Sequence, residues 1–145
     1  MEFFQRLFVA LTQLHPTHPM IVHFPIALTG AAFLFILLAY WRKNPSLEQT
    51  AFANITLAAI STVVAGITGY LDNIKNYLGE APNASTKIVL AITLFIVTTS
   101  LSLVRYRNPR LFETGNRILY IAAYGLSFAI ALVLAFLGGV ILYGF

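Results

Sequence analysis

Four long apolar segments constrain this chain more than any other feature of its sequence. They cover about residues 19–41, 51–71, 88–104 and 118–143, and none of them contains Asp, Glu, Lys or Arg. A helix crosses the hydrocarbon core of a bilayer with about 20 apolar residues. The chain is therefore predicted to be an all-α membrane protein, a four-helix transmembrane bundle with up-down-up-down topology. The same lack of charge inside the segments disfavours a transporter.

Composition supports this prediction and excludes several kinds of chemistry. Of the 145 residues, 59% are hydrophobic and 10% are charged, whereas about 25% of the residues in soluble domains are charged. The absence of cysteine excludes disulfides and thiolate sites. The net charge of +4 comes from basic residues in short loops, a pattern typical of topology signals and not of a nucleic-acid surface. Four spans leave no room for a soluble catalytic domain, so we expect no enzyme.

The first fourteen residues have a different pattern. Over residues 2–14, aromatic and leucine side chains recur at helical spacing, mostly opposite polar ones, which predicts an amphipathic helix in the membrane interface. A cleaved signal peptide is the alternative, but an acid follows Met1 and no small-residue cleavage site precedes His15. We therefore expect an interfacial helix over residues 1–14 and a four-helix transmembrane domain over residues 15–145.

The distribution of basic residues predicts how the bundle is oriented. With four spans, both termini and the second loop share one side of the bilayer, and the other two loops share the opposite side. Three basic residues lie on the first side and six on the second: Arg6, Lys75 and Lys87 against Arg42, Lys43, Arg105, Arg107, Arg110 and Arg117. Because cytoplasmic loops carry the excess of Lys and Arg, both termini are predicted to face the periplasm from a bacterial inner membrane.

All three histidines lie in a proline-rich stretch that leads into the first span. Pro19 suits a helix start, and Pro25 removes a backbone donor inside the helix, which predicts a kink and a free carbonyl near His23. On a helix, His18 and His23 differ by roughly 140° around the axis, so they do not share a face. His15 and His18 are separated by proline, which favours extended backbone. A metal bound by all three rings therefore requires the segment to fold back.

Topology identifies the groups that these histidines could meet. They lie at the end of the second span, the start of the third and the end of the fourth: Thr68, Tyr70, Asp72, Ser85, Thr86, Lys87 and Tyr143. Asp72 follows a helix carboxyl end, where the dipole opposes a negative charge, so it is expected to take a cationic partner.

Three interpretations of the histidines stay open. His18 and His23 could bind a metal, or a b-type haem could be held by one histidine, by a histidine with Met20 or a tyrosine, or between subunits. The third interpretation is an interfacial imidazole that bonds a freed carbonyl or a lipid headgroup. The candidate cofactor-binding residues are His15, His18, His23, Asp72 and Tyr143.

Small residues in the second span predict close packing between helices, because they let backbones approach where lipid offers no hydrophobic drive. They include Ala58, Ala59, Ser61, Ala65, Gly66 and Gly69. Gly138 and Gly139 form a further small pair in the fourth span. Aromatic residues near the predicted interfaces are interpreted as a belt: Tyr40, Trp41, Tyr70, Tyr106, Tyr120 and Tyr143.

Three motifs resemble the bacterial membrane-protein family known as domain of unknown function 2231. They are His15-Pro16-x-His18-Pro19-x-x-Val22-x-Phe24-Pro25-Ile26-Ala27, Thr68-Gly69-Tyr70-Leu71-Asp72 and Gly138-Gly139-x-x-x-Tyr143. The resemblance covers essentially the whole chain after residue 14. It implies a four-helix membrane domain, often found with c-type cytochrome modules, and hence a connection to haem or electron transfer.

The chain departs from the family pattern in two places. Similar proteins commonly carry a histidine early in the third span, where this chain has Ser85, Thr86 and Lys87. Many also place an acid in the first span, where residues 32–40 are entirely apolar or aromatic. Both departures favour a non-catalytic subunit of a larger membrane complex concerned with electron transfer. The expected partners are the bilayer, other membrane subunits or a second copy, and a c-type cytochrome.

Overall fold

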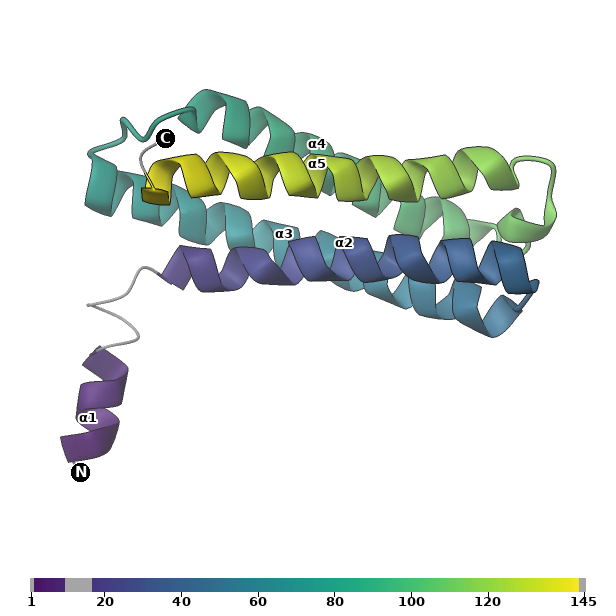
Figure 1. Ribbon diagram of the computed structural model, residues 1–145, viewed down its shortest axis with the longest axis horizontal. Helices are drawn as coiled ribbons and strands as arrows, with labels where there is room; N and C mark the ends of the chain where they lie inside the picture. The colour runs from purple at the N-terminus through teal and green to yellow at the C-terminus, as the bar shows by residue number, and fades with distance from the viewer. Residues whose placement is uncertain (1, 10–16, 144–145) are drawn as a thin grey trace.

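The computed structural model describes residues 2–9 and 17–143, and the described part contains helices and connecting turns (Figure 1). In chain order the elements are α1 (Glu2–Val9), α2 (Thr17–Arg42), α3 (Pro45–Tyr77), α4 (Ala84–Arg107), the short 3-10 helix η2 (Leu111–Glu113) and α5 (Arg117–Tyr143).

Helices α2 to α5 form an antiparallel bundle in which each helix packs against two others. Helix α2 contacts α3 and α5, and α4 contacts the same two helices from the other side. The α2–α3 turn and the α4–α5 connection share one end of the bundle, which we call the turn end (Figure 1). The start of α2, the α3–α4 loop and the end of α5 share the opposite end, which we call the histidine end. The predicted up-down-up-down bundle is confirmed.

All four bundle helices are long and apolar enough to cross a membrane. Their outward faces carry exposed leucine, isoleucine, valine and phenylalanine side chains, which suits contact with lipid instead of water. The interior is built largely from small side chains, among which Ala32, Ala39, Ala51 and Ala58 are fully buried. Close approach of helices through small residues is the packing mode typical of membranes, and the predicted packing role of α3 is confirmed.

Helix α3 begins earlier than the second apolar segment does, and its start is set by local sequence. The side chain of Asn44 accepts a hydrogen bond from the Ser46 backbone N–H at 2.9 Å, and Pro45 occupies the first helical position. Both are standard features of a helix start. As a result, Glu48 lies in the first turn of the helix and not in the preceding loop.

The far end of α3 is closed by a left-handed residue. Leu78 has a φ of 53°, and its N–H bonds the carbonyl of Asn73. The Asn73 amide donates to the carbonyl of Gly79 at 3.2 Å, and its oxygen accepts from the Ala81 N–H at 3.0 Å. One side chain thus orders the loop between α3 and α4.

Helices α2 and α5 pack through two reciprocal glycine–phenylalanine contacts. A Cβ atom added to Gly30 would lie 2.9 Å from the ring of Phe128, and one added to Gly125 would lie 3.1 Å from the ring of Phe33. The two rings lie 6.2 Å apart between centroids. Each glycine therefore makes room for a ring from the opposite helix, which holds these two helices close together.

The amino-terminal helix α1 covers the first part of the segment predicted to be amphipathic. The side chains of residues 2–6 are exposed, and Arg6 pairs with Glu2 at 3.6 Å, one turn away. Phe3 and Phe4 are both exposed and meet edge to face. The remainder of that prediction, residues 10–14, lies outside the described residues.

Candidate functional site

His18 is held between α2 and α3 at the histidine end of the bundle. Its Nδ1 lies 3.3 Å from the Thr68 Oγ1, and its ring is half-buried. The ring also lies directly over Gly69, because a Cβ atom there would come within 2.7 Å of the His18 Cε1. The glycine is therefore required by the close approach of the imidazole. This contact brings together two of the motifs quoted above.

Two charged side chains accompany His18. Asp72 from α3 and Lys87 from α4 lie close enough for their charges to act on the imidazole and on each other. Asp72 also accepts a hydrogen bond from the Asn76 amide one turn later. Three helices thus contribute to a half-buried cluster of His18, Thr68, Asp72 and Lys87. The expectation that Asp72 follows the helix end was wrong, because α3 continues to Tyr77 and Asp72 lies inside it.

His23 occupies a different face of α2 and is exposed. Its Nδ1 bonds the backbone carbonyl of Pro19 at 2.5 Å. Because a carbonyl only accepts hydrogen bonds, Nδ1 is the donor, which in a neutral ring leaves the lone pair on Nε2. A ring bonded in this way is ready to bind a metal through the other nitrogen. Within residues 2–9 and 17–143, no three histidine or carboxylate side chains gather into a metal cluster.

Of the other predicted site residues, some lie outside the described part of the chain and others lie in α2. His15 lies outside the described residues, and Tyr143 ends α5 with a side chain that is also outside them. Pro25 is buried inside a continuous α2, and its carbonyl accepts from the hydroxyl of the buried Thr29 at 2.7 Å. Pro19 lies in the first turn of the same helix.

The predicted small-residue positions also differ from one another. Gly69 packs as described, whereas a Cβ atom at Gly66 or at Gly138 would meet nothing within 4 Å. Gly139 lies in α5 and is half-buried. Gly66 and Gly138 therefore do not serve close packing inside the chain, and they leave open space on its outer surface.

A second polar site, which the sequence analysis missed, lies at the turn end. Glu48 is 3% exposed and forms a two-point ion pair with Arg105, with Nε to Oε1 at 2.6 Å and Nη2 to Oε2 at 2.7 Å. The Tyr120 hydroxyl donates to Glu48 at 3.1 Å and lies 2.9 Å from the Tyr124 hydroxyl. The network joins α3, α4 and α5.

The geometry of this network favours a structural role over a catalytic one. Both carboxylate oxygens of Glu48 accept from the planar fork of Arg105, the geometry that gives strong paired hydrogen bonds. Tyr120 and Tyr124 are 4% and 0% exposed, which leaves the acid little access to a substrate. The assignment of Tyr120 to an aromatic belt was wrong, because its ring faces inward; Trp41, in contrast, is 79% exposed.

A shallow groove runs between α3 and α4 on the outer surface. It is mostly apolar, and its lining comprises Thr56, Ala59, Ile60, Val63, Val64, Phe95, Thr99, Ser102 and Leu103. Thr56 donates to the Ser102 hydroxyl at 3.2 Å and so links the two helices across its base. The Thr99 hydroxyl is buried and has no hydrogen-bond partner among the described residues.

Comparison with known proteins gives one match. A family model described as a predicted membrane protein, domain of unknown function 2231, covers residues 14–145. No curated protein and no solved structure matches the chain.

Proposed function

The chain belongs to the domain of unknown function 2231 family of membrane proteins, and from this premise we propose that it is a non-catalytic subunit of a larger membrane complex. The observation that carries the proposal is the groove between α3 and α4. The groove is almost entirely apolar and lies on the outer surface of the bundle, where a helix from another subunit can pack against it in place of lipid.

The shape of α3 supports the same proposal. Ala59, Val63 and Gly66 follow each other at intervals of four and three residues, so they lie on one face of the helix. The open space at Gly66 allows a second backbone to approach closely there, as small residues do at membrane interfaces. The surface offered to a neighbouring helix is thus apolar, with open space beside it at Gly66.

The electron-transfer part of the proposal rests on the association of similar proteins with c-type cytochrome modules. Two observations favour a structural role over a catalytic role. The buried acid Glu48 is fully engaged by Arg105, and Asp72 accepts a hydrogen bond from the Asn76 amide. A complex that carries electrons would thus gain a rigid membrane anchor from this chain, with its redox centre in another subunit.

A second candidate function is binding of a b-type haem or a metal shared with another subunit. The hydrogen bond of the exposed His23 favours it, because Nδ1 donates to the Pro19 carbonyl and leaves Nε2 as the nitrogen that could bind a metal. The ring fits a single axial ligand. His18 lies on another face of α2, against Gly69, so the second ligand would come from another subunit or from a residue outside the described part of this chain.

One purification distinguishes these two candidates. The tagged protein is extracted gently, its co-purifying subunits are quantified, and a visible spectrum is taken with and without dithionite alongside Fe, Cu and Zn analysis. For the subunit proposal, Gly66→Leu is expected to lower the yield of partner subunits about tenfold, equivalent to about 1.4 kcal/mol of association energy. Gly138→Leu is the matched control, because it fills similar open space on α5.

The outcomes of this purification are distinct. Equal losses from Gly66→Leu and Gly138→Leu would contradict a docking role for the groove. A bare spectrum with intact partner binding supports the first candidate. A Soret band that disappears in His23→Ala, with folding unchanged, would favour the second candidate instead.

We also propose that both termini face the periplasm. Arg105 is neutralised by Glu48, yet without it five basic residues lie at the turn end against three on the other side of the membrane, so the direction of the charge bias is unchanged. An alkaline phosphatase fused to the carboxyl terminus is expected to be active and a fluorescent protein fused there to be dark. The opposite pair of readings would reverse the orientation.

A further inference from the structure

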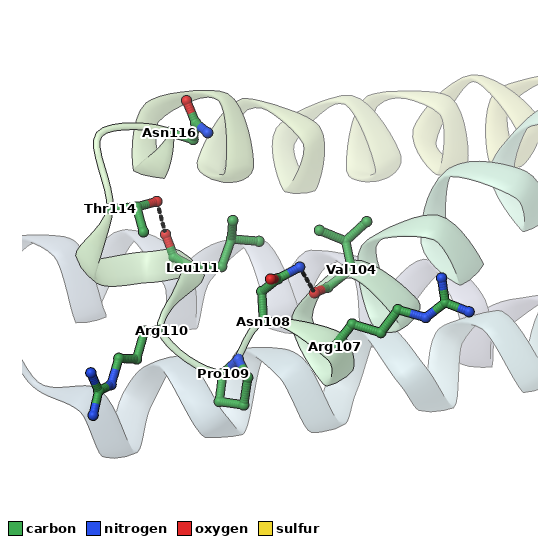
Figure 2. A pocket seen from close by; sticks show the side chains of 8 residues that line it. All are labelled: Val104, Arg107, Asn108, Pro109, Arg110, Leu111, Thr114 and Asn116. Carbon is green, nitrogen blue, oxygen red and sulfur yellow. Dashed lines mark hydrogen bonds between the residues drawn. The ribbon is translucent and has the colours of Figure 1, made fainter.

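A cavity of about 660 Å³ opens at the turn end, where α4 passes into α5. Its lining comprises Val104, Arg107, Asn108, Pro109, Arg110, Leu111, Thr114 and Asn116 (Figure 2). The cavity is wide open to the surface, so a ligand bound there stays partly exposed. The cavity is distinct from the groove between α3 and α4 and from the histidine cluster, since no residue is shared.

The walls of the cavity are held by the connection itself. The Asn108 amide donates to the Val104 carbonyl at 3.2 Å, and the Thr114 hydroxyl donates to the Leu111 carbonyl at 2.7 Å (Figure 2). The Leu111 N–H bonds the Asn108 carbonyl at 3.0 Å. These bonds shape a short wall of backbone around the opening, so the cavity does not depend on a long flexible loop.

The connection around the cavity carries an excess of positive charge. Arg107 and Arg110 are exposed, and neither forms an ion pair with any of the described residues. Of the two acids at this end, Glu48 is already neutralised by Arg105, and Glu113 in η2 is exposed. Figure 2 shows the two arginine side chains pointing in opposite directions. Each is long and exposed, so each reaches an anion in the cavity by a change of rotamer.

The base of the cavity is apolar and continues onto the membrane-facing surface. Val104 is about half exposed on the last turns of α4, and Leu111 is half-buried against the bundle core. Because α4 ends at Arg107, the arginines lie where a spanning helix leaves the hydrocarbon and lipid headgroups begin. A ligand that fits has an anionic head and an apolar tail.

We propose that this cavity binds the phosphate group of an anionic phospholipid, with Arg107 and Arg110 as its cationic ligands. The planar fork of arginine matches phosphate oxygens in pairs, and basic pockets at the ends of membrane helices are suited to anionic headgroups. One acyl chain then lies along the apolar surface at Val104. The phosphate of the bound lipid offsets part of the positive charge at the turn end of the bundle.

The test is a lipid titration of the full chain in a neutral detergent, followed by native mass spectrometry. Phosphatidylglycerol is compared with phosphatidylcholine of the same acyl chains at physiological ionic strength. The R107Q/R110Q variant is expected to lose about 25-fold in affinity for phosphatidylglycerol, which is roughly fivefold for each basic residue near an anionic headgroup. Affinity for phosphatidylcholine is expected to change little.

The matched control is R42Q/K43Q, which removes the same charge from the other connection at the same end of the bundle. It is expected to lose less than about threefold, because screening limits electrostatic reach to about 8 Å. Equal losses in both variants would overturn the proposal in favour of general surface attraction. Unchanged binding in R107Q/R110Q would also overturn it.

Inorganic phosphate provides the remaining arm of the experiment. If the cavity serves a lipid, millimolar phosphate leaves the first phosphatidylglycerol bound, since the acyl chain adds its own contacts. Displacement of the lipid by free phosphate would overturn the proposal and assign the cavity to a soluble anion. All four substituted residues are exposed, and unchanged thermal unfolding in detergent alone verifies that each variant is folded.

Discussion

Arg105→Met is expected to destabilise the bundle by about 3–5 kcal/mol, the cost of leaving a buried charge without its partner. In this variant Glu48 keeps the Tyr120 hydroxyl but loses both bonds from the guanidinium group. The carboxylate is 3% exposed, so water cannot replace the lost donors. The measurement is reversible unfolding in mixed micelles, followed by circular dichroism.

Two further variants separate this electrostatic effect from a loss of packing. The double variant Glu48→Met/Arg105→Met is expected to recover most of the lost stability, because an apolar pair of similar volume often replaces a buried ion pair without cost. Arg107→Met is the matched control, because Arg107 follows Arg105 in the same helix and is exposed. It is expected to change stability by less than about 0.5 kcal/mol. A double variant no more stable than Arg105→Met would show that the arginine acts through something other than its charge.

Gly30→Val is expected to cost about 1–3 kcal/mol, the usual range for overpacking a tight interior. The first added carbon would already lie 2.9 Å from the Phe128 ring, so the ring must move or the two helices must separate. The same unfolding assay measures the effect. Gly138→Val is the control, because a Cβ atom there meets nothing within 4 Å.

The reciprocal geometry supplies a rescue experiment. Removing the ring in Gly30→Val/Phe128→Ala is expected to give a loss smaller than the sum of the two single variants, since contacting residues are not additive. Strict additivity would indicate that valine is tolerated without moving the ring. The pair Gly125 and Phe33 lies in the same interface, and it provides an independent repeat of the experiment.

The fold followed from the sequence because the membrane leaves few alternatives. Each apolar segment is long enough to span, and backbone groups in lipid must bond within their own helix. Helix topology then determined which ends lie together, so the proximity of His18 to Thr68, Asp72 and Lys87 could be predicted without coordinates. Neither inference required knowledge of side-chain packing.

The Glu48 network could not be found from apolar segments alone. Counting hydrophobic residues placed the second span at about residue 51, whereas the capping pair Asn44 and Pro45 starts the helix earlier. That capping signal was present in the sequence and would have placed Glu48 inside α3. The partner Arg105 was interpreted as a topology signal. Whether its side chain is buried depends on which face of α4 packs against the bundle, and apolar segments alone do not determine that.

Glycine positions were also only partly predictable. Gly66 and Gly69 both looked like packing residues, yet only the second has a ring against it. They are three residues apart, and the difference depends on the position of α2 around α3. Gly30 and Gly125 could not be recognised as packing positions, because in each case the phenylalanine that needs the space lies on the opposite helix.

The ion pair at the turn end also has a consequence for the order in which the protein assembles. Glu48 and Arg105 are 57 residues apart in the chain, so a ribosome that adds about 5–20 residues each second makes the acid about 3–11 s before the base. During that interval Glu48 lacks the partner that it has in the finished protein. Completion of the second hairpin supplies it, and the two halves of the protein then mature as one unit.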